Sequence, residues 1–113
     1  MSRILIIGGT GFIGRHVALE AARRNWVTLI ISKQKTKRPI KNKLIKYKTI
    51  DIENLDACKY LRDKQFDYIV NASGYVDHSN FTTNGLKIIN QHFIGVINVI
   101  KSINRGKIKK FVQ

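Results

Sequence analysis

Three glycines near the start of the chain, Gly8, Gly11 and Gly14, are spaced at three-residue intervals. They follow an apolar run over residues 4–7 and precede a segment with helical periodicity. A strand, a glycine turn and a helix in this order would direct backbone N–H groups, and the positive end of a helix dipole, toward an anionic oxygen. A glycine turn also lets a ligand approach the backbone without meeting a Cβ atom. The pattern therefore predicts a phosphate-binding site and, inside a βαβ unit, a cradle for the pyrophosphate of a dinucleotide.

The residues of this turn have different expected tasks. The first glycine would permit the tight turn after the strand, the second would admit the pyrophosphate, and the third would let the helix pack against the sheet. The amides that open the helix would face the phosphate oxygens. The candidate cofactor-binding residues in the turn are Gly8, Thr10, Gly11, Phe12, Ile13 and Gly14. The competing interpretation is a glycine-rich turn of an α/β protein that binds no ligand.

Short apolar runs and helical patterns alternate along the whole chain. We expect strands at residues 3–7, 27–31, 44–50, 66–71 and 108–112, and helices at residues 12–24, 54–64 and 81–104. This alternation predicts one α/β domain, residues 1–113, with a doubly wound, Rossmann-like parallel sheet in the strand order 3-2-1-4-5. The ligand crevice would lie at the carboxyl ends of strands one and four. Because the chain ends within strand five, we expect a domain that is truncated there.

The end of the second predicted strand bears on the form of the cofactor. An acid about 20 residues beyond the glycines usually accepts a hydrogen bond from the adenosine ribose 2′-hydroxyl in NAD-binding proteins. Here that place holds Ser32, followed by Lys33, and no carboxylate occurs from Asn25 through Ile50. Ser32 can donate to a 2′-phosphate, and the basic residues after it can neutralise the phosphate charge. The sequence therefore favours NADP(H) over NAD(H); the alternative is a neutral strand end that distinguishes neither form.

The glycine turn, which reads Gly8-Gly9-Thr10-Gly11-Phe12-Ile13-Gly14, resembles that of the extended short-chain dehydrogenase/reductase superfamily, the group of sugar-nucleotide epimerases and dehydratases. Three further stretches, residues 51–52, 71–74 and 90–98, are similar to it in order and spacing. The resemblance implies that the first stretch reaches the adenine, that the second lines the ribose and nicotinamide side, and that the third forms a helix beside the reaction site. It adds to the candidate cofactor-binding residues Asp51, Ile52, Asn71, Ala72, Ser73 and Asn90.

The resemblance also implies catalytic residues that these 113 positions do not supply. Hydride transfer in this superfamily uses a Ser or Thr after strand five and a Tyr-x-x-x-Lys pair on the following helix. We expect such residues beyond Gln113 and no catalytic residue within the chain. Tyr60 and Lys64 have the Tyr-x-x-x-Lys spacing. Because their predicted helix runs away from the crevice toward the amino edge of the sheet, we interpret them as surface residues.

The cysteine, histidine and apolar content indicates the setting of the protein. The single cysteine, Cys58, allows no internal disulfide and fits a reducing compartment. This fits a cytoplasmic protein, and because no apolar run is long enough to span a membrane, no membrane partner is expected. Cys58 falls in a predicted helix and is interpreted as a packed thiol. The three histidines and one cysteine lack ligand spacing, so no metal site is predicted.

A net charge of +14 raises the question of an anionic partner. Residues 33–48 hold eight lysines and arginines and no acid, which is typical of a solvated basic loop. Only Tyr47 interrupts this run as an aromatic, so nucleic-acid binding is not favoured. The predicted function is the NAD(P)-binding portion of an oxidoreductase or nucleotide-sugar epimerase/dehydratase. The alternatives are a non-catalytic NADP(H)-binding or redox-sensing module and a basic nucleic-acid-binding protein; substrate and oligomeric state stay open.

Overall fold

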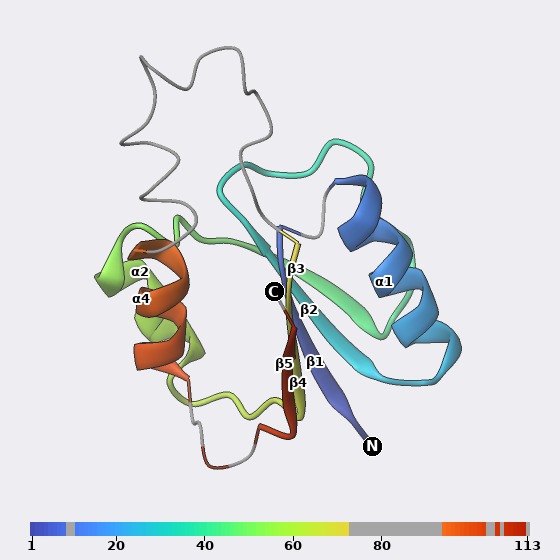
Figure 1. Cartoon of the computed structure of the whole chain (residues 1–113). Coiled ribbons are helices and arrows are strands. Elements are labelled where there is room, and N and C mark those ends of the chain that lie inside the picture. The colour runs from blue at the N-terminus through green and yellow to red at the C-terminus, as the bar shows by residue number, and fades with distance from the viewer. Residues whose placement is uncertain (9–10, 73–93, 104–105, 107, 113) are drawn as a thin grey trace.

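A five-stranded parallel sheet with helices on both faces forms the architecture of the chain (Figure 1). The computed structural model describes residues 1–8, 11–72, 94–103, 106 and 108–112. The strands are β1 (Arg3–Ile7), β2 (Val27–Ser32), β3 (Ile45–Thr49), β4 (Tyr68–Asn71) and β5 (Lys110–Val112). The helices are α1 (Phe12–Arg23), α2 (Leu55–Cys58), the 3₁₀ helix η1 (Lys59–Leu61) and α4 (Gly95–Ser102). The strand order β3-β2-β1-β4-β5 confirms the predicted Rossmann-like sheet.

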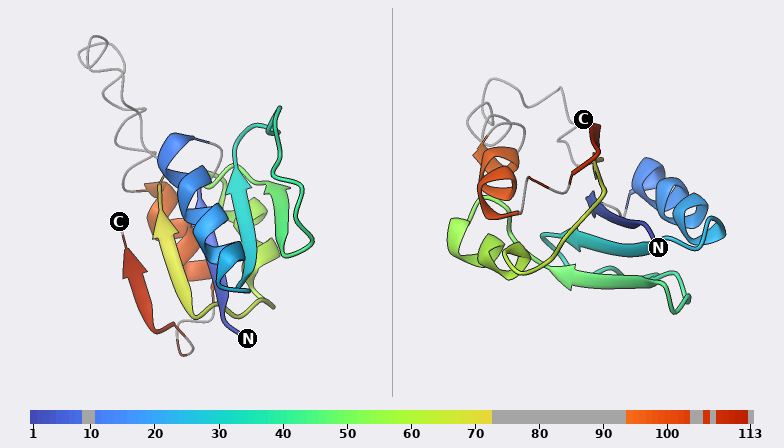
Figure 2. Two further views of the ribbon diagram at one scale, coloured as in Figure 1. Left: turned by 90° about the vertical axis from the view of Figure 1, so that its right-hand side faces the viewer. Right: turned by 90° about the horizontal axis from the view of Figure 1, so that it is seen from below.

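Side chains of β1 alternate between two hydrophobic clusters, one on each face of the sheet. Leu5 and Ile7 pack with residues of α2 and α4, including Val99. Ile4 and Ile6 lie in the other cluster, with residues of α1. Figure 1 shows α1 on one side of the sheet and α2 and α4 on the other, and the left view of Figure 2 shows α1 in front of the strands. Because both faces of β1 are covered, this strand reads as a continuous apolar run.

Helix α1 ends in a motif that the sequence pattern did not reveal. Asn25 has φ 60°, the left-handed conformation that asparagine tolerates better than most residues. The amide of Trp26 donates to the Ala21 carbonyl at 2.9 Å, and the amide of Asn25 donates to the Ala22 carbonyl at 2.9 Å. This pair of bonds is a Schellman motif, which satisfies carbonyls at the helix end. It turns the chain directly into β2.

The helix predicted at residues 54–64 is shorter than expected. Asn54 caps α2 by accepting a hydrogen bond from the Ala57 amide at 3.2 Å, and η1 then ends at Leu61. The amide of Lys64 donates to the Leu61 carbonyl, a tight turn rather than a further helical turn. Leu61 is fully buried, and the next four residues are polar, so continuing the helix would bury no further apolar side chain.

The long helix predicted at residues 81–104 is described only in its second half. There α4 buries Val96 and Val99 against the sheet, and Ile103 leaves the helix with φ −85° and ψ 161°. Residues 81–93 lie outside the described residues. Among the helices that the structure describes, none is long and apolar enough to cross a membrane.

Truncating a central core side chain is expected to destabilise the sheet strongly. Leu5 of β1 is 0% exposed, whereas Leu19 on α1 is 44% exposed. Leu5→Ala should lower the free energy of unfolding by about 2–5 kcal/mol because it removes buried methyl groups and leaves a cavity. Leu19→Ala, the matched control, should cost about 0.5 kcal/mol or less. Urea denaturation followed by circular dichroism measures both values, and equal losses would contradict the assigned core.

Candidate functional site

The carboxyl ends of four parallel strands bring the candidate residues to one edge of the sheet. The amide of Gly8 donates to the Ile31 carbonyl at 2.8 Å, so the glycine turn lies beside the end of β2. The amide of Ile50 donates to the Ser32 carbonyl at 2.8 Å, so the loop after β3 begins beside the same strand end. On the other side of β1, Asn71 at the end of β4 pairs with the last residue of β1. The edge therefore runs from the loop after β3, past Ser32 and the glycine turn, to the end of β4.

The turn from β1 into α1 leaves the first helical turn without a side-chain cap. Gly8 has φ 76°, the left-handed region in which glycine is favoured. The helical hydrogen bonds begin with the Arg15 amide, which donates to the Gly11 carbonyl at 2.9 Å. Gly11 is the N-cap residue and provides no side-chain hydrogen bond, and the first turn contains no acid. The N–H groups at this end and the helix dipole favour an anionic ligand.

The space above Gly11 fits a closely approaching ligand. Its backbone has φ −82° and ψ −176°, an extended conformation open to any residue, so the local fold does not demand glycine there. Within the part of the chain that the structure describes, a Cβ added to Gly11 would meet no atom within 4 Å. The absence of a side chain therefore keeps this space clear at the helix N-terminus. A pyrophosphate fits such a cradle because its oxygens would receive the amides while its bulk lies where the Cβ would be.

The first two residues of α1 expose apolar side chains beside this cradle. Phe12 is 79% exposed and Ile13 is 65% exposed. The Phe12 ring packs edge-on against His16, with 4.6 Å between the ring centroids. Gly14, by contrast, is buried where the helix meets the sheet. The turn thus combines an exposed apolar rim with a tightly packed base.

The basic loop, residues 33–44, is tied to both α1 and β3. The guanidinium of Arg15 donates through Nη1 to the Arg38 carbonyl at 2.9 Å. The amide of Ile40 donates to the Tyr47 hydroxyl at 2.9 Å. The first bond holds the backbone of the loop at Arg38 beside the first turns of α1, and the second fixes the loop to β3.

The hydroxyl of Ser32, which was expected to donate to a 2′-phosphate, already donates a hydrogen bond within the protein. It donates to the Gln34 carbonyl at 2.7 Å. A hydroxyl has one hydrogen to donate, so a 2′-phosphate would compete with this carbonyl for it. The neighbouring Lys33 is exposed, and its amine makes no hydrogen bond or ion pair with the described residues that would compete with a phosphate. Recognition of a 2′-phosphate at this strand end would therefore depend more on Lys33 than on the serine hydroxyl.

The loop after β3 is organised by Asp51. Its Oδ1 accepts a hydrogen bond from the Glu53 amide at 3.0 Å, and its carbonyl accepts one from the Asn54 amide at 2.9 Å. Such bonds form an Asx turn, which fixes the direction of a short loop. Asp51 and Ile52 are both half-buried at the edge of the sheet. These hydrogen bonds therefore give the loop a fixed conformation at the edge of the sheet.

The end of β4 supplies the last part of the candidate site that is described. Asn71 is 8% exposed, and the Ala72 amide donates to the carbonyl of the last residue of β1 at 2.8 Å. Both residues thus stand directly beside the glycine turn. The predicted contact residues Thr10, Ser73 and Asn90 lie outside the described residues.

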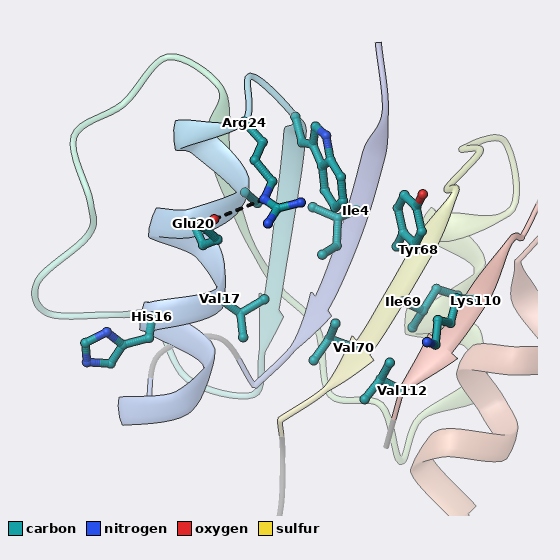
Figure 3. Close-up of a pocket in the computed structure, with 12 residues that line it drawn as sticks. Ile4, His16, Val17, Glu20, Arg24, Tyr68, Ile69, Val70, Lys110 and Val112 are labelled. Atoms are coloured by element: carbon teal, nitrogen blue, oxygen red, sulfur yellow. Dashed lines mark hydrogen bonds and ion pairs between the residues drawn. The ribbon is translucent and has the colours of Figure 1, made fainter.

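A separate apolar groove lies between α1 and strands β4 and β5 (Figure 3). It has a volume of about 390 Å³ and is lined by Val17, Val70 and Val112 among others. Trp26 and Tyr68 also line it, and their rings stack with centroids 4.7 Å apart and an angle of 3°. None of the candidate cofactor-binding residues that the structure describes lines this groove. It is distinct from the site at the carboxyl edge of the sheet.

Comparison with known proteins gives the family of the chain. The model of the family described as "NAD dependent epimerase/dehydratase family" matches residues 4–113. The chain belongs to this family. Among curated relatives, a phenylcoumaran benzylic ether reductase of Ginkgo biloba is 37% identical over 98% of the chain. A UDP-glucose 4-epimerase of Lactobacillus helveticus is 26% identical over 97% of the chain.

The chain spans 34% of the length of each of these two relatives of the epimerase/dehydratase family. Among solved structures, Pen from Bacillus thuringiensis has a TM-score of 0.82 and 26% identity, covering 97% of this chain and 36% of that one. UDP-glucose 4-epimerase of Thermus thermophilus in complex with NAD has a TM-score of 0.77 and 17% identity, covering 88% and 33%. The matched third contains the glycine turn and the Rossmann-like sheet, so the chain corresponds to the NAD(P)-binding portion of this family.

Tyr60 and Lys64, which have the spacing of the superfamily's catalytic pair, form a surface contact. The Lys64 Nζ lies 4.4 Å from the centroid of the Tyr60 ring, and the Lys48 Nζ lies 4.7 Å from the same centroid. Two ammonium groups over one ring are cation–π contacts, and Tyr60 is 42% exposed. Both residues follow α2 in the sequence, and their contact lies at the protein surface.

Two residues outside the predicted cofactor-binding set, Arg15 and Asn98, make contacts that organise the site and that the sequence did not predict. Arg15 holds the basic loop, and its signal is its position directly after the third glycine. Asn98 donates a hydrogen bond to the Ile52 carbonyl at 2.9 Å. Its signal is a polar residue at helical spacing among the apolar residues of α4, beside Val96 and Val99.

Proposed function

We propose that this chain binds a nicotinamide dinucleotide at the carboxyl edge of its sheet, with the pyrophosphate at the N-terminus of α1. The observation that carries the proposal is the clear space at Gly11, where a Cβ would meet no described atom within 4 Å. An extended backbone at that position accepts any residue, so the glycine is best explained by the ligand that approaches it. Membership of the epimerase/dehydratase family supports the identity of that ligand.

The adenosine half would extend from the cradle toward β2 and β3. The ribose would lie beside Ser32 and Lys33, and the adenine beside Asp51 and Ile52, because these pairs follow the glycine turn in order along the edge. No acid stands at the end of β2 to repel a 2′-phosphate, and the Lys33 ammonium would attract one. NADP(H) is therefore the favoured form. Toward β4 the proposed contacts are Asn71, Ala72, Ser73 and Asn90.

For the whole protein, we propose hydride transfer between the bound nicotinamide and a substrate carbon. Residues 1–113 would form the cofactor-binding domain, and the Ser or Thr and the Tyr-x-x-x-Lys pair would be supplied by polypeptide beyond it. A nucleotide sugar is the proposed substrate class, supported by the similarity to the UDP-glucose 4-epimerase of Lactobacillus helveticus. A cytoplasmic location is proposed with it, where such cofactors and a reduced Cys58 would be found.

Fluorescence of NADPH tests the cofactor proposal. Adding the protein to NADPH should change its emission saturably, with one molecule bound per chain. Because the proposed contacts among the described residues involve mainly the adenosine and pyrophosphate, 2′-phospho-ADP-ribose should displace NADPH, and nicotinamide mononucleotide should not at the same concentration. An emission that never saturates, or displacement only by the mononucleotide, would refute the proposed site.

A further inference from the structure

The backbone carbonyl of Ile52 accepts hydrogen bonds from two buried side chains, those of Asn98 and Cys58. The Asn98 amide Nδ2 donates to it at 2.9 Å, across 46 residues of sequence. The Cys58 thiol donates to it through Sγ at 3.6 Å. Asn98 is 9% exposed and Cys58 is 0% exposed, so both donors lie inside the protein. A loop at the ligand edge is thereby anchored from the core.

Asn98 is itself held firmly. It lies in the middle of α4, and its own carbonyl accepts a hydrogen bond from the Ser102 hydroxyl at 2.8 Å. The next residue, Val99, is fully buried in the cluster that also contains Cys58 and Ile50. Since the backbone of α4 is fixed by this packing, the Asn98 amide presents its N–H group to the loop from a defined place.

The Cys58 thiol remains a neutral donor in this setting. Burial raises the pKa of the Cys58 thiol, and the nearby negative charge of Asp51 raises it further. A thiol whose pKa is raised keeps its hydrogen at neutral pH. A thiol is a weak donor, however, so the amide of Asn98 makes the stronger of the two bonds to Ile52.

The anchored carbonyl lies next to the groups that the proposed function assigns to the adenine. Asp51 precedes Ile52, and one Asp51 oxygen is already oriented by the Glu53 amide at 3.0 Å. The Asn98 amide fixes the carbonyl of Ile52, and the Asx turn fixes one oxygen of Asp51. The Asp51 carboxylate therefore has one preferred orientation. A carboxylate in a fixed direction can distinguish the amino group of adenine, a donor, from the carbonyl oxygen of hypoxanthine, an acceptor.

We propose that Asn98 is a positioning residue that sets the loop of Asp51 and Ile52 for recognition of the adenine base. This inference rests on the proposed function and adds to it the base specificity and the residue that maintains it. Loss of the Asn98 amide leaves the Ile52 carbonyl with the weak thiol donor alone, and the loop gains freedom to turn. The affinity for NADPH and the discrimination between bases should then fall together.

The test compares NADPH with its hypoxanthine analogue, nicotinamide hypoxanthine dinucleotide phosphate in the reduced form. The unmodified protein should bind NADPH about tenfold more tightly than the analogue, as expected for one hydrogen bond to a charged group. Asn98→Leu, similar in size but without an amide, should weaken NADPH binding about tenfold and bring the two dissociation constants within about twofold. Lys101→Ala, at an exposed position of the same helix, is the control and should keep the tenfold preference. Asn98→Ala provides a second variant, with folding of each checked by circular dichroism.

The outcomes separate this inference from the cofactor proposal. An unmodified protein that binds neither dinucleotide would overturn the proposed function and this inference with it. NADPH binding without preference over the analogue would overturn the inference alone. An Asn98 variant that weakens both ligands equally, and so keeps the tenfold ratio, would mark Asn98 as a structural residue and contradict positioning. The expected result is that the Asn98 variants lose the tenfold preference for NADPH and that Lys101→Ala keeps it.

Discussion

Gly11→Ala is expected to weaken NADPH binding about 100-fold while the protein keeps its fold. The new methyl group would enter the clear space at the start of α1, where no described atom lies within 4 Å of it. Overlap with a tightly held group costs about 1–3 kcal/mol, and 2.8 kcal/mol corresponds to 100-fold in affinity. The free protein should tolerate the methyl because the backbone at Gly11 has φ −82° and ψ −176°. Titration of NADPH fluorescence gives the affinity, and thermal unfolding gives the stability.

Gly106→Ala is the matched control for this substitution. Gly106 is exposed and precedes β5, so it lies toward the amino edge of the sheet, opposite the proposed crevice. Its replacement should leave NADPH binding within about twofold of the unmodified protein. If Gly11→Ala bound NADPH as tightly as the unmodified protein, the pyrophosphate would have to lie elsewhere.

Ser32→Asp is expected to reverse the preference between the two cofactors. A carboxylate at the end of β2 would repel a 2′-phosphate and would accept a hydrogen bond from a 2′-hydroxyl. We expect NADPH affinity to fall about 100-fold and NADH affinity to stay the same or rise. Two like charges about 4 Å apart repel each other by about 4 kcal/mol at an effective dielectric of 20. This repulsion exceeds the 2.8 kcal/mol that corresponds to a 100-fold loss of affinity. Parallel titrations with NADPH and NADH measure the reversal.

Ser32→Asn separates the charge from the loss of the hydroxyl. Both substitutions abolish the bond from the Ser32 hydroxyl to the Gln34 carbonyl, which measures 2.7 Å. Only the aspartate adds a negative charge, so the asparagine variant should retain most of the preference for NADPH. Unchanged selectivity in Ser32→Asp would remove the argument for a 2′-phosphate at this strand end. An equal effect of both substitutions would assign the selectivity to the hydroxyl instead of the charge.

The sheet could be predicted from sequence because its signals are local. Strands such as Arg3–Ile7 and Val27–Ser32 are short apolar runs bounded by polar or glycine residues, and β1 is observed with the predicted bounds. Once the strands are parallel and their order is known, the ends that meet at one edge follow from topology. The sequence alone therefore predicted that Gly8, Ser32 and Asp51 lie at the same edge of the sheet.

Other parts of the site depend on contacts that local patterns do not encode. The bond from Asn98 to the Ile52 carbonyl joins residues 46 positions apart. The bond from Arg15 to the Arg38 carbonyl depends on the path of a loop without periodicity. Such side chain-to-backbone bonds decide the shape of the loops, and the loops carry the proposed specificity.

The most direct test of the central claim is an amide NMR titration of the ¹⁵N-labelled protein with NADPH. If the pyrophosphate binds at the N-terminus of α1, the largest chemical-shift changes should occur at the amides of Phe12, Ile13 and Gly14. Smaller changes should occur at the amides of Ser32 and Lys33. The amides of the residues that line the groove between α1 and strands β4 and β5 should show only small chemical-shift changes. Shifts concentrated on that groove, or none at saturating NADPH, would contradict the proposed cradle.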